Sequence, residues 1–351
     1  MAPDGELTQI VAVTASVLVA IVTAVGWDRL RDCARGRALV VRTIAVAACV
    51  ATAVLAGFVT VDRTFEFYGN WTDIVGLASA DEPAAAADPG ADAAHSQIVP
   101  FAVHGTASHL DLPAYAYLPA GYATGTRRLP VVEALDGFPG SPRVWLRSLL
   151  ARQLLDQEIA ARRIPPMVVV FPTQTVTAQR DSECVDAVGG PALDTFLTTD
   201  VPAAVEHRFR VRTDAAGWGL IGYSTGGFCA VNLALRHPDR YAAAASLSGY
   251  FSAITDHTTG DLYRGSPQTR LENSPLWRVT ALPVPSLALY IATAQDDRPG
   301  YAQLRRFAEV AKPPLRVTTA TVPVGGHSRK VWRQMAAPAF DWLASWLAGP
   351  E

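Results

Sequence analysis

The fold is decided by the stretch Trp218-Gly219-Leu220-Ile221-Gly222-Tyr223-Ser224-Thr225-Gly226-Gly227, in which an apolar run leads into a G-x-S-x-G pattern. A helix-like segment, residues 227–236, follows at once. A serine on a sharp turn between a strand and a helix presents its hydroxyl above the sheet, and glycines flank it because a side chain there would collide with neighbouring backbone. Five residues can match by chance, but their context favours a nucleophile elbow with Ser224 as the nucleophile.

Two later strand-like runs end in residues that suit the partners of such a serine. Residues 287–292 lead to Asp296 and Asp297, and residues 317–322 lead to His327. In α/β-hydrolases the acid follows the serine in the chain and the histidine comes last, each in a loop after a strand. Among the seven histidines of the chain, His327 alone follows a late strand-like run. It is therefore the predicted general base, with a solvated loop histidine as the alternative.

The predicted acid is one of two adjacent aspartates, of which only one can point at the imidazole. Spacing favours Asp297, which would accept a hydrogen bond from one ring nitrogen of His327 and so fix the tautomer that lets the other nitrogen take the serine proton. Asp296 is the alternative acid. The aspartate that does not serve would be an ordinary turn or capping residue.

A glycine-rich turn ends an earlier strand-like run, residues 131–135, and reads Asp136-Gly137-Phe138-Pro139-Gly140. In this kind of fold one oxyanion donor is the N–H of the residue after the nucleophile, here Thr225. The other comes from an early strand-to-helix loop, here Phe138. An ordinary type I or II turn is the alternative reading of the same residues.

Within residues 101–351, strand-like and helix-like segments alternate, which predicts an α/β fold with a mostly parallel sheet covered by helices on both faces. Residues 251–278 show weak periodicity and form either a small cap over the site or a surface excursion. The predicted strands cover residues 115–117, 129–135, 167–171, 218–221, 243–247, 286–291 and 316–322, and the predicted helices cover 145–161, 192–208, 227–236, 300–311 and 330–346.

The first part of the chain predicts a membrane hairpin, residues 1–64. Residues 7–27 and 43–61 contain no charged side chain, and each run is long enough to span a bilayer. The alternative is a pair of buried core helices, although soluble helices seldom run so long without a polar face. The loop between the spans, residues 28–42, carries five arginines against two aspartates, which places it in the cytoplasm by the positive-inside rule.

The chain starts with Asp4 and Glu6 and no basic side chain, unlike a cleaved signal peptide. Both ends of the hairpin then point outward. We expect a multi-pass protein of the cell membrane, with a flexible extracytoplasmic linker at residues 65–97 and a catalytic domain at residues 98–351 outside the cytoplasm.

Cysteine usage agrees with that division. Cys33 and Cys49 fall in the cytoplasmic loop and second span, whereas Cys184 and Cys229 fall in the outer domain. Cys229 lies just after the elbow and Cys184 follows the strand-like run 167–171, so neighbouring strands would bring them together. An oxidising compartment would allow a disulfide worth about 2 to 4 kcal/mol. Two separate buried thiols are the alternative.

From about Phe101 to its end, the chain resembles the esterase-D branch of the α/β-hydrolases, which includes the secreted mycolyltransferases. The resemblance implies a serine hydrolase or acyltransferase whose triad is Ser224, His327 and an acidic residue. Its motifs stand in order as Tyr117-Leu118-Pro119-Ala120-Gly121-Tyr122, Leu135-Asp136-Gly137, Gly222-Tyr223-Ser224-Thr225-Gly226-Gly227, His237-Pro238-Asp239-Arg240-Tyr241, Ser246-Leu247-Ser248-Gly249-Tyr250, Asn273-Ser274-Pro275-Leu276, and Gly325-Gly326-His327 with Trp332.

The same resemblance makes Asp136 a candidate substrate-binding residue, because the matching aspartate of the transferases helps to hold a sugar hydroxyl. An aspartate before glycine is equally a turn residue. The chain departs from the transferases directly afterwards, since it continues Phe138-Pro139-Gly140-Ser141-Pro142 where they carry a polar segment with an arginine. Transfer of a mycolyl group to trehalose is not expected on that account.

These patterns together predict two-step acyl transfer on an acyl ester, which could be a lipid or glycolipid. Water as second nucleophile gives an esterase, and a sugar or cell-envelope hydroxyl gives an acyltransferase. A non-catalytic binding module on the same fold is a further alternative. A net charge of −2 over 351 residues suggests no nucleic-acid partner. No metal or cofactor is predicted.

Overall fold

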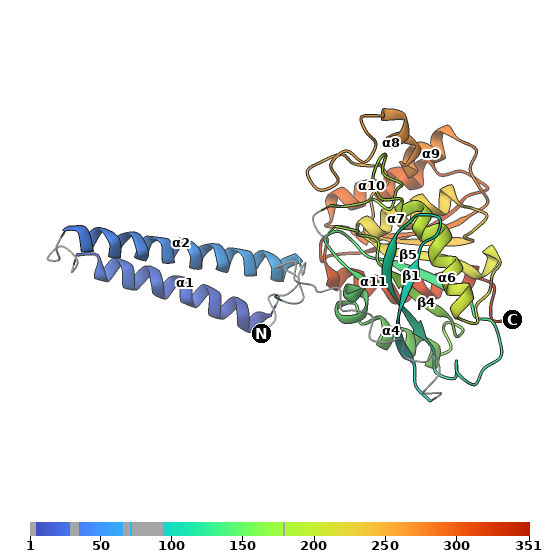
Figure 1. Cartoon of the computed structure of the whole chain (residues 1–351), viewed down its shortest axis with the longest axis horizontal. Coiled ribbons are helices and arrows are strands. Elements are labelled where there is room, and N and C mark those ends of the chain that lie inside the picture. The colour runs from blue at the N-terminus through green and yellow to red at the C-terminus, as the bar shows by residue number, and fades with distance from the viewer. Residues whose placement is uncertain (1–4, 29–34, 66–70, 72–93, 178–179) are drawn as a thin grey trace. The chain divides into compact units, whose positions relative to one another are not determined.

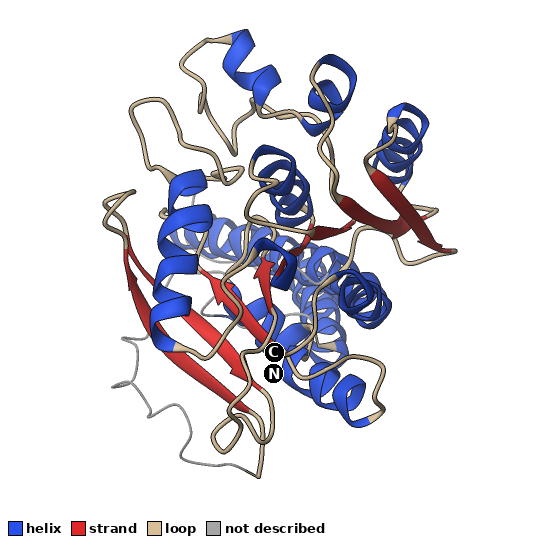
Figure 2. Ribbon diagram, turned by 90° about the vertical axis from the view of Figure 1, so that its right-hand side faces the viewer, coloured by secondary structure: helices blue, strands red, loops and turns tan. Residues whose placement is uncertain are grey.

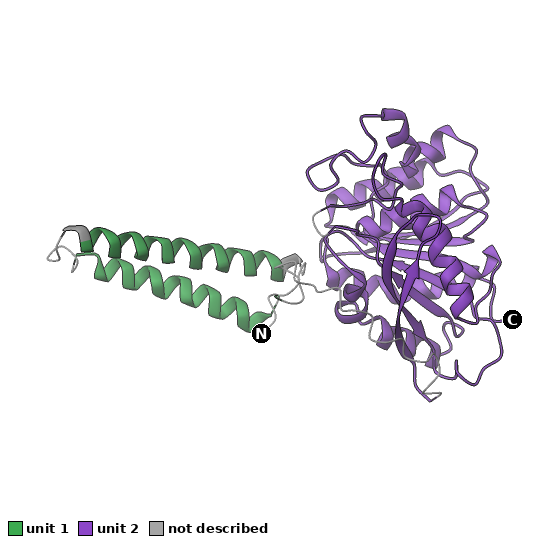
Figure 3. Ribbon diagram, in the orientation of Figure 1, with its two compact units in different colours: residues 1–78 green, residues 79–351 purple. Residues whose placement is uncertain are grey.

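The computed structural model describes residues 5–28, 35–65, 71, 94–177 and 180–351. The chain forms two compact units, Met1–Ala78 and Ser79–Glu351, which are coloured separately in Figure 3 and are taken here in turn. The boundaries predicted for the domains are not tested by this division, and most of the predicted linker lies outside the described residues.

The first unit is a pair of helices, α1 (Glu6–Gly26) and α2 (Arg35–Phe65). Polar side chains join them at two levels, since Gln9 Nε2 donates to Thr60 Oγ1 at 3.3 Å and Cys49 Sγ to Thr23 Oγ1 at 3.3 Å. Most large apolar side chains of the pair point outward and are exposed. By length and composition alone, both helices could cross a membrane, with mean hydropathies of 2.2 and 2.4.

The second helix begins earlier than the charge pattern suggests. Residues 35–42, predicted as part of a loop, form its first two turns. Arginine and alanine are good helix formers, so the helix continues through the charged residues. The last arginine shows where the apolar stretch begins, whereas the helix itself begins earlier. Arg42 contacts the end of the other helix, donating to the Trp27 carbonyl at 3.1 Å with its guanidinium 4.8 Å from that ring centre.

The second unit is built on one eight-stranded sheet with the order β1-β2-β4-β3-β5-β6-β7-β8. β1 pairs antiparallel with β2, and β2 pairs antiparallel with β4, whereas the pairs from β4 to β8 are parallel. The strands are β1 (Gln97–His104), β2 (Asp111–Leu118), β3 (Val131–Leu135), β4 (Val168–Pro172), β5 (Trp218–Tyr223), β6 (Ala243–Leu247), β7 (Ala288–Ala294) and β8 (Arg316–Val322).

Helices cover both faces of this sheet, as Figures 1 and 2 show. Apolar side chains of α6, α7, α9 and α10 pack in one core, and those of the short helical turn η2, α4 and α11 pack in the other. The helical elements are η2 (Val144–Ser148), α4 (Ala151–Ala160), α5 (Leu193–Thr195), η3 (Phe196–Asp200), α6 (Val201–Arg208), η4 (Ala215–Gly217), α7 (Thr225–Arg236), α8 (Pro267–Glu272), α9 (Pro275–Ala281), α10 (Arg298–Val310) and α11 (Arg329–Trp346).

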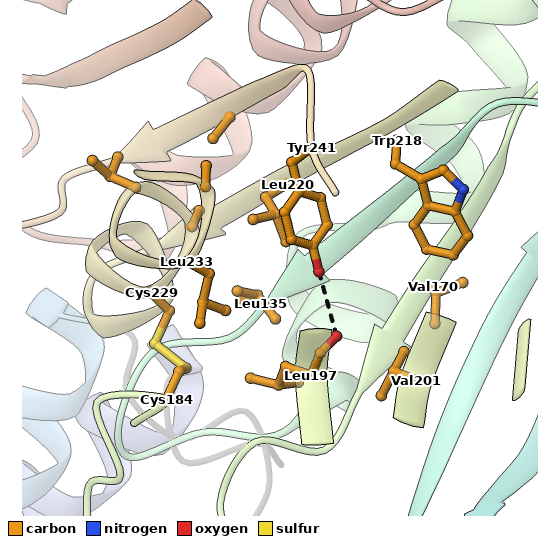
Figure 4. Close-up of a cluster of buried hydrophobic side chains, with 14 of the residues drawn as sticks. Leu135, Val170, Cys184, Leu197, Val201, Trp218, Leu220, Cys229, Leu233 and Tyr241 are labelled. Atoms are coloured by element: carbon orange, nitrogen blue, oxygen red, sulfur yellow. Dashed lines mark hydrogen bonds between the residues drawn. A yellow bond between two sulfur atoms is a disulfide. The ribbon is translucent and has the colours of Figure 1, made fainter. Parts of the chain in front are cut away.

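The middle strands are mostly apolar because both of their faces are covered, with Glu133 of β3 as a buried exception. All five residues of β3 and all six of β5 are buried. Figure 4 shows part of the first core, where Leu135, Val170 and Leu220 of the sheet face Leu197 and Val201 of the covering helical segment. The predicted mostly parallel sheet with helices on both faces is thus present.

Two kinds of element were not predicted. β1 contains Pro100, which weakens its strand pattern, but β1 is an edge strand, where a missing N–H is tolerated. Helices α8 and α9 lie in the weakly periodic segment 251–278 and its continuation. With six and seven residues, they are too short to show a helical period. Each has a serine at its N-cap followed by a proline, a pair that also occurs in turns and therefore did not predict a helix.

Candidate active site

Ser224 lies on the turn between β5 and α7, and its backbone is strained. Its φ of 55° and ψ of −123° belong to a region that residues with side chains seldom adopt. The flanking glycines make the turn possible, since a Cβ on Gly222 would collide with the backbone of Gly226, and a Cβ on Gly226 would collide with the Leu135 carbonyl. The local geometry is that of a nucleophile elbow.

The structure brings Ser224, His327 and Asp297 together in a hydrogen-bonded series. His327 Nε2 lies 2.9 Å from Ser224 Oγ, and His327 Nδ1 lies 2.9 Å from Asp297 Oδ2. The three residues follow β5, β8 and β7, so they meet because parallel strands deliver their carboxyl ends to the same edge of the sheet. The side chain of the aspartate is 7% exposed and that of the histidine 34%, which leaves the imidazole accessible.

Asp297 has a second contact, because it also caps α10 by accepting the Gly300 N–H at 3.2 Å. Burial opposes ionisation of its carboxyl. The hydrogen bond and charge of His327, together with the Gly300 N–H, outweigh that effect and lower the pKa of Asp297 below its ordinary value. An ionised carboxylate is what holds an imidazole in one tautomer and stabilises its protonated form.

Asp296, the alternative acid, points elsewhere. Its two carboxylate oxygens accept the N–H groups of Gly325 at 2.9 Å and Gly326 at 2.8 Å. These bonds favour the charged form and lower its pKa. Both glycines have positive φ, at 133° and 61°, and they directly precede His327. The adjacent aspartates thus divide two tasks: Asp297 contacts the imidazole and Asp296 holds the turn that carries it.

Trp332, which the sequence placed in a motif without a role, supports the imidazole. Its ring lies edge-on to His327 at a centroid distance of 5.1 Å and is stacked on Tyr223 at 4.5 Å. It is one turn into α11, so the helix fixes the ring and the ring fixes the imidazole. Trp332 lies five positions after His327, beyond the Ser328 cap that begins α11, and this spacing gave no signal in the sequence.

The two expected oxyanion donors flank the nucleophile. Neither the Thr225 nor the Phe138 N–H donates to an acceptor among the described residues. Thr225 is the first residue of α7, where N–H groups are unsatisfied within a helix. The turn bearing Phe138 approaches Ser224 closely, since a Cβ on Gly137 would lie 3.0 Å from the serine Cβ.

Asp136, the candidate substrate contact, is buried beneath that turn, with 1% exposure. Neither carboxylate oxygen has a hydrogen-bond partner among the described residues, and burial raises its pKa well above the ordinary value. A Cβ on Gly140 would sit 3.3 Å from both Asp136 Oδ2 and the Tyr223 hydroxyl, so the turn packs over both groups. A substrate hydroxyl would reach this carboxyl only if the turn opened.

A network behind the site was not foreseen. Thr225 Oγ1 donates to Asp181 Oδ2 at 2.8 Å. Two residues on, Glu183 accepts the hydroxyls of Tyr250 and Tyr263 at 2.8 and 2.7 Å. Burial raises the pKa of Glu183 to about 7. The next residue forms a disulfide with α7, since Cys184 and Cys229 are bonded (Figure 4). The acidic residues just before Cys184 were the available signal.

Two other histidines with resolved partners belong to structural contacts. His237, at the end of α7, has its Nε2 2.6 Å from Asp194, which also accepts from Arg236 at 2.8 Å. His104 pairs with Asp111 across β1 and β2 at 3.0 Å, on the surface. Neither is bonded to a serine hydroxyl, unlike His327.

The strand order, the elbow and the Ser-His-Asp series define the class of this protein as an α/β-hydrolase. Residues 107–345 match the model of the family described as "Putative esterase". The match covers more than half of the chain, which therefore belongs to that family. The resemblance read from the sequence motifs is confirmed.

Curated relatives share this region. An uncharacterized protein of Corynebacterium glutamicum is 27% identical over 241 residues, covering 66% of this chain and 56% of the relative. The MPT51 antigen of Mycobacterium leprae is 34% identical over 80 residues, covering 23% of this chain and 26% of the relative. The chain thus spans about half the length of the first relative and about a quarter of the second.

Solved structures show the same fold. A ferulic acid esterase superimposes with a TM-score of 0.62 at 18% identity, covering 72% of this chain and 98% of the other. An S-formylglutathione hydrolase from Agrobacterium tumefaciens gives 0.60 at 18% identity, covering 72% and 96%. MPT51 from Mycobacterium tuberculosis gives 0.54 at 17% identity, covering 71% and 98%. The predicted α/β-hydrolase fold is confirmed.

Proposed function

We propose that this protein is a serine esterase that cleaves carboxylic esters through an acyl-enzyme. The observation that carries the proposal is the unbroken series Ser224–His327–Asp297 on a strained elbow. Membership of the esterase family supports it independently of that geometry. The proposal assigns Ser224 as nucleophile, His327 as general base and Asp297 as the orienting acid.

In the proposed first step, His327 Nε2 takes the Ser224 proton while the serine oxygen attacks the ester carbonyl. The 2.9 Å separation of these atoms is within the reach needed for proton transfer. The N–H groups of Thr225 and Phe138 stabilise the developing oxyanion, aided by the positive end of α7. The protonated imidazole, held by Asp297, then gives its proton to the departing alcohol.

In the second step an acceptor attacks the acyl-enzyme, and its identity decides the reaction class. Water gives hydrolysis. A sugar or cell-envelope hydroxyl gives acyl transfer, a second candidate that is favoured by the local match to MPT51 and by the mycolyltransferase-like motifs. A lipid or glycolipid ester is the corresponding substrate class. A non-catalytic binding module has less support, because a lost activity would leave no reason to keep the strained serine beside an imidazole that an aspartate orients.

The test is labelling with a fluorophosphonate probe, together with hydrolysis of p-nitrophenyl esters. We expect Ser224→Ala to abolish labelling and to reduce kcat by roughly 10⁴-fold to 10⁶-fold, because the nucleophile is lost. Ser148→Ala is the matched control, since the Ser148 hydroxyl accepts a hydrogen bond from Arg329 at 3.3 Å and is bonded to no histidine among the described residues. Undiminished turnover in the Ser224 variant would refute the assignment.

We further propose that α1 and α2 anchor the protein in the cell membrane with the catalytic unit on the extracytoplasmic side. The length and mean hydropathy of both helices support the anchor, as does the outward exposure of their apolar side chains. The arginines between the helices support the orientation. The Cys184–Cys229 bond also fits an oxidising compartment.

The anchor is tested by washing membranes with alkaline carbonate. We expect the full chain to remain in the pellet, because its two apolar helices stay in the bilayer, whereas residues 98–351 alone should be recovered in the supernatant. The orientation is read by adding protease to intact spheroplasts, which should degrade the catalytic unit. Release of the full chain by carbonate would contradict the anchor, and protection from protease would contradict the orientation.

A further inference from the structure

A cavity of about 350 Å³ lies among α8, α9, α10 and the loop that follows β6. Figure 1 shows these three helices toward one end of the second unit. The volume is within the range of small-molecule sites. The cavity is distinct from the triad, because Arg306 on its wall lies nine residues along α10 from Asp297, which is roughly 14 Å at 1.5 Å per residue.

The cavity combines a cationic and an apolar wall. Arg270 of α8 and Arg306 of α10 line it from two different helices, and Leu271, Trp277 and Val310 supply apolar surface. A pocket lined by apolar and aromatic side chains with a few placed polar groups is typical of a ligand site. Arginine is suited to carboxylates, because its planar guanidinium can donate two parallel hydrogen bonds.

Neither arginine forms an ion pair within the described part of the chain. The acidic residues closest to them in sequence have other partners, since Glu272 accepts from Gln268 at 2.8 Å and Glu309 faces Arg305 at 3.7 Å. Two unpaired cations beside an indole and aliphatic side chains therefore complement an anion that carries a compact apolar body.

We propose that this cavity is an accessory binding site for an apolar carboxylate, with Arg270 and Arg306 as the anion-binding residues and Trp277 as the contact for the apolar body. The choice of carboxylate over other anions rests on the proposed function, because ester cleavage releases a carboxylic acid. The existence of an anion site rests on the cavity and its two arginines alone.

The cavity is connected to the catalytic edge through one short segment. The Leu276 N–H at the cavity donates to the Phe251 carbonyl at 2.8 Å, and the Ala253 N–H donates to Ser274 Oγ at 3.0 Å. The same segment contains Tyr250, which is stacked on Phe228 of α7 at 4.7 Å. A bound molecule would thus lie against the loop that follows β6 and contacts α7. It would not occupy the position of the triad.

The test is calorimetric titration of the full chain in lipid nanodiscs with 4-phenylbutyrate, with empty nanodiscs as the blank. The neutral analogue 4-phenylbutanamide measures the contribution of the charge, and inorganic phosphate measures binding of an anion without an apolar body. We expect phenylbutyrate to bind at least about tenfold more tightly than either, a difference of about 1.4 kcal/mol.

The double variant Arg270→Gln with Arg306→Gln should weaken phenylbutyrate binding by about tenfold or more and leave the amide unaffected. Arg305→Gln is the matched control, because Arg305 is adjacent but does not line the cavity, and it should bind as the parent does. Equal melting temperatures of the variants establish that they are folded, and Trp277→Leu, which keeps both arginines, should also weaken binding.

The proposal is overturned if the double variant binds phenylbutyrate as well as the parent, if the amide or phosphate binds equally tightly, or if no binding is found at millimolar concentration. Because binding is measured without turnover, this result and the outcome of the Ser224→Ala experiment are separate. Retained hydrolysis in Ser224→Ala would show that the proposed function has failed, whereas retained binding of phenylbutyrate in the double variant would show that the accessory site has failed.

Discussion

Asp297, at the carboxyl edge of the sheet, and Glu133, at its centre, have pKa values shifted in opposite directions. At the edge, Asp297 meets His327 and a helix N-terminus, and its pKa is lowered. At the centre, Glu133 of β3 has no exposed surface, and burial raises its pKa to about 8. Its Oε1 accepts the Tyr241 hydroxyl at 3.1 Å, while Oε2 has no partner among the described residues.

This difference follows from the hydrogen-bond donors that are available to a carboxyl at the centre of the sheet and at its carboxyl edge. Strand backbones in the centre use their own N–H and C=O groups in the ladder, so a buried carboxyl there has only side chains to bond. At the carboxyl edge the chain leaves the ladder, and free backbone N–H groups and helix ends become available as donors. Backbone donors of this kind help to keep an acid ionised.

Among the changes that test this contrast, the largest effect is expected from Asp297→Asn, which removes the ionised carboxylate at the carboxyl edge. An amide cannot stabilise the protonated imidazole, and it favours the wrong tautomer of His327. We expect kcat for ester hydrolysis to fall by about 10⁴-fold, the cost of the equivalent change in a serine protease triad. Steady-state kinetics on p-nitrophenyl esters provide the measurement.

The neighbouring change, Asp296→Asn, is the matched control for that prediction. Asparagine can still accept an N–H from the glycine turn through its carbonyl oxygen, so the loss should be about tenfold or less. If the two variants lose the same activity, or if Asp296→Asn loses more, the assignment of the acid to Asp297 is wrong.

A smaller effect is expected at the centre, from Glu133→Gln. Because the pKa of Glu133 is raised by burial, the native state keeps a proton that the unfolded chain releases. Native stability therefore falls as the pH rises from the unfolded pKa of about 4.5 toward 8, by at most about 1.4 kcal/mol per pH unit. Glutamine has no proton to lose, so the variant should gain stability relative to the parent as the pH rises.

Urea unfolding of both proteins at pH 5.5 and pH 7.5 measures this gain. Glu309→Gln is a suitable control, since Glu309 lies on the surface and its paired arginine contributes little. A difference between the Glu133 variant and its parent that stays constant with pH would show that Glu133 is not held protonated, and the contrast between edge and centre would then fail.

Much of the catalytic unit could be predicted from sequence. β6 and β8 were predicted with the bounds that the structure has, because each consists almost entirely of small or β-branched residues. The site residues Ser224 and His327 are marked by glycines, which the chain needs wherever the backbone turns sharply. The choice between Asp296 and Asp297 rested on spacing alone, and the structure brings the second of them to the imidazole.

The parts that could not be predicted depend on contacts between distant segments. Asp181 reaches Thr225 across 44 positions of sequence, and no local pattern reports such a contact. Trp332 acquires its role only when α11 packs against the sheet. Burial of Asp136 likewise depends on the fold of the following turn over Tyr223, whereas the motif itself indicated only a turn or a sugar contact.

The bond between Cys184 and Cys229 also means that making this protein is a redox reaction. Each chain must give up two electrons and two protons, so every finished molecule consumes one two-electron oxidant from its surroundings. A cytosol kept reduced by thiols does not supply it. Protein made there would keep Cys184 and Cys229 as buried thiols, three residues after Asp181 and four residues after Thr225. The yield of finished protein would then be limited by the supply of oxidant and not by the rate of synthesis.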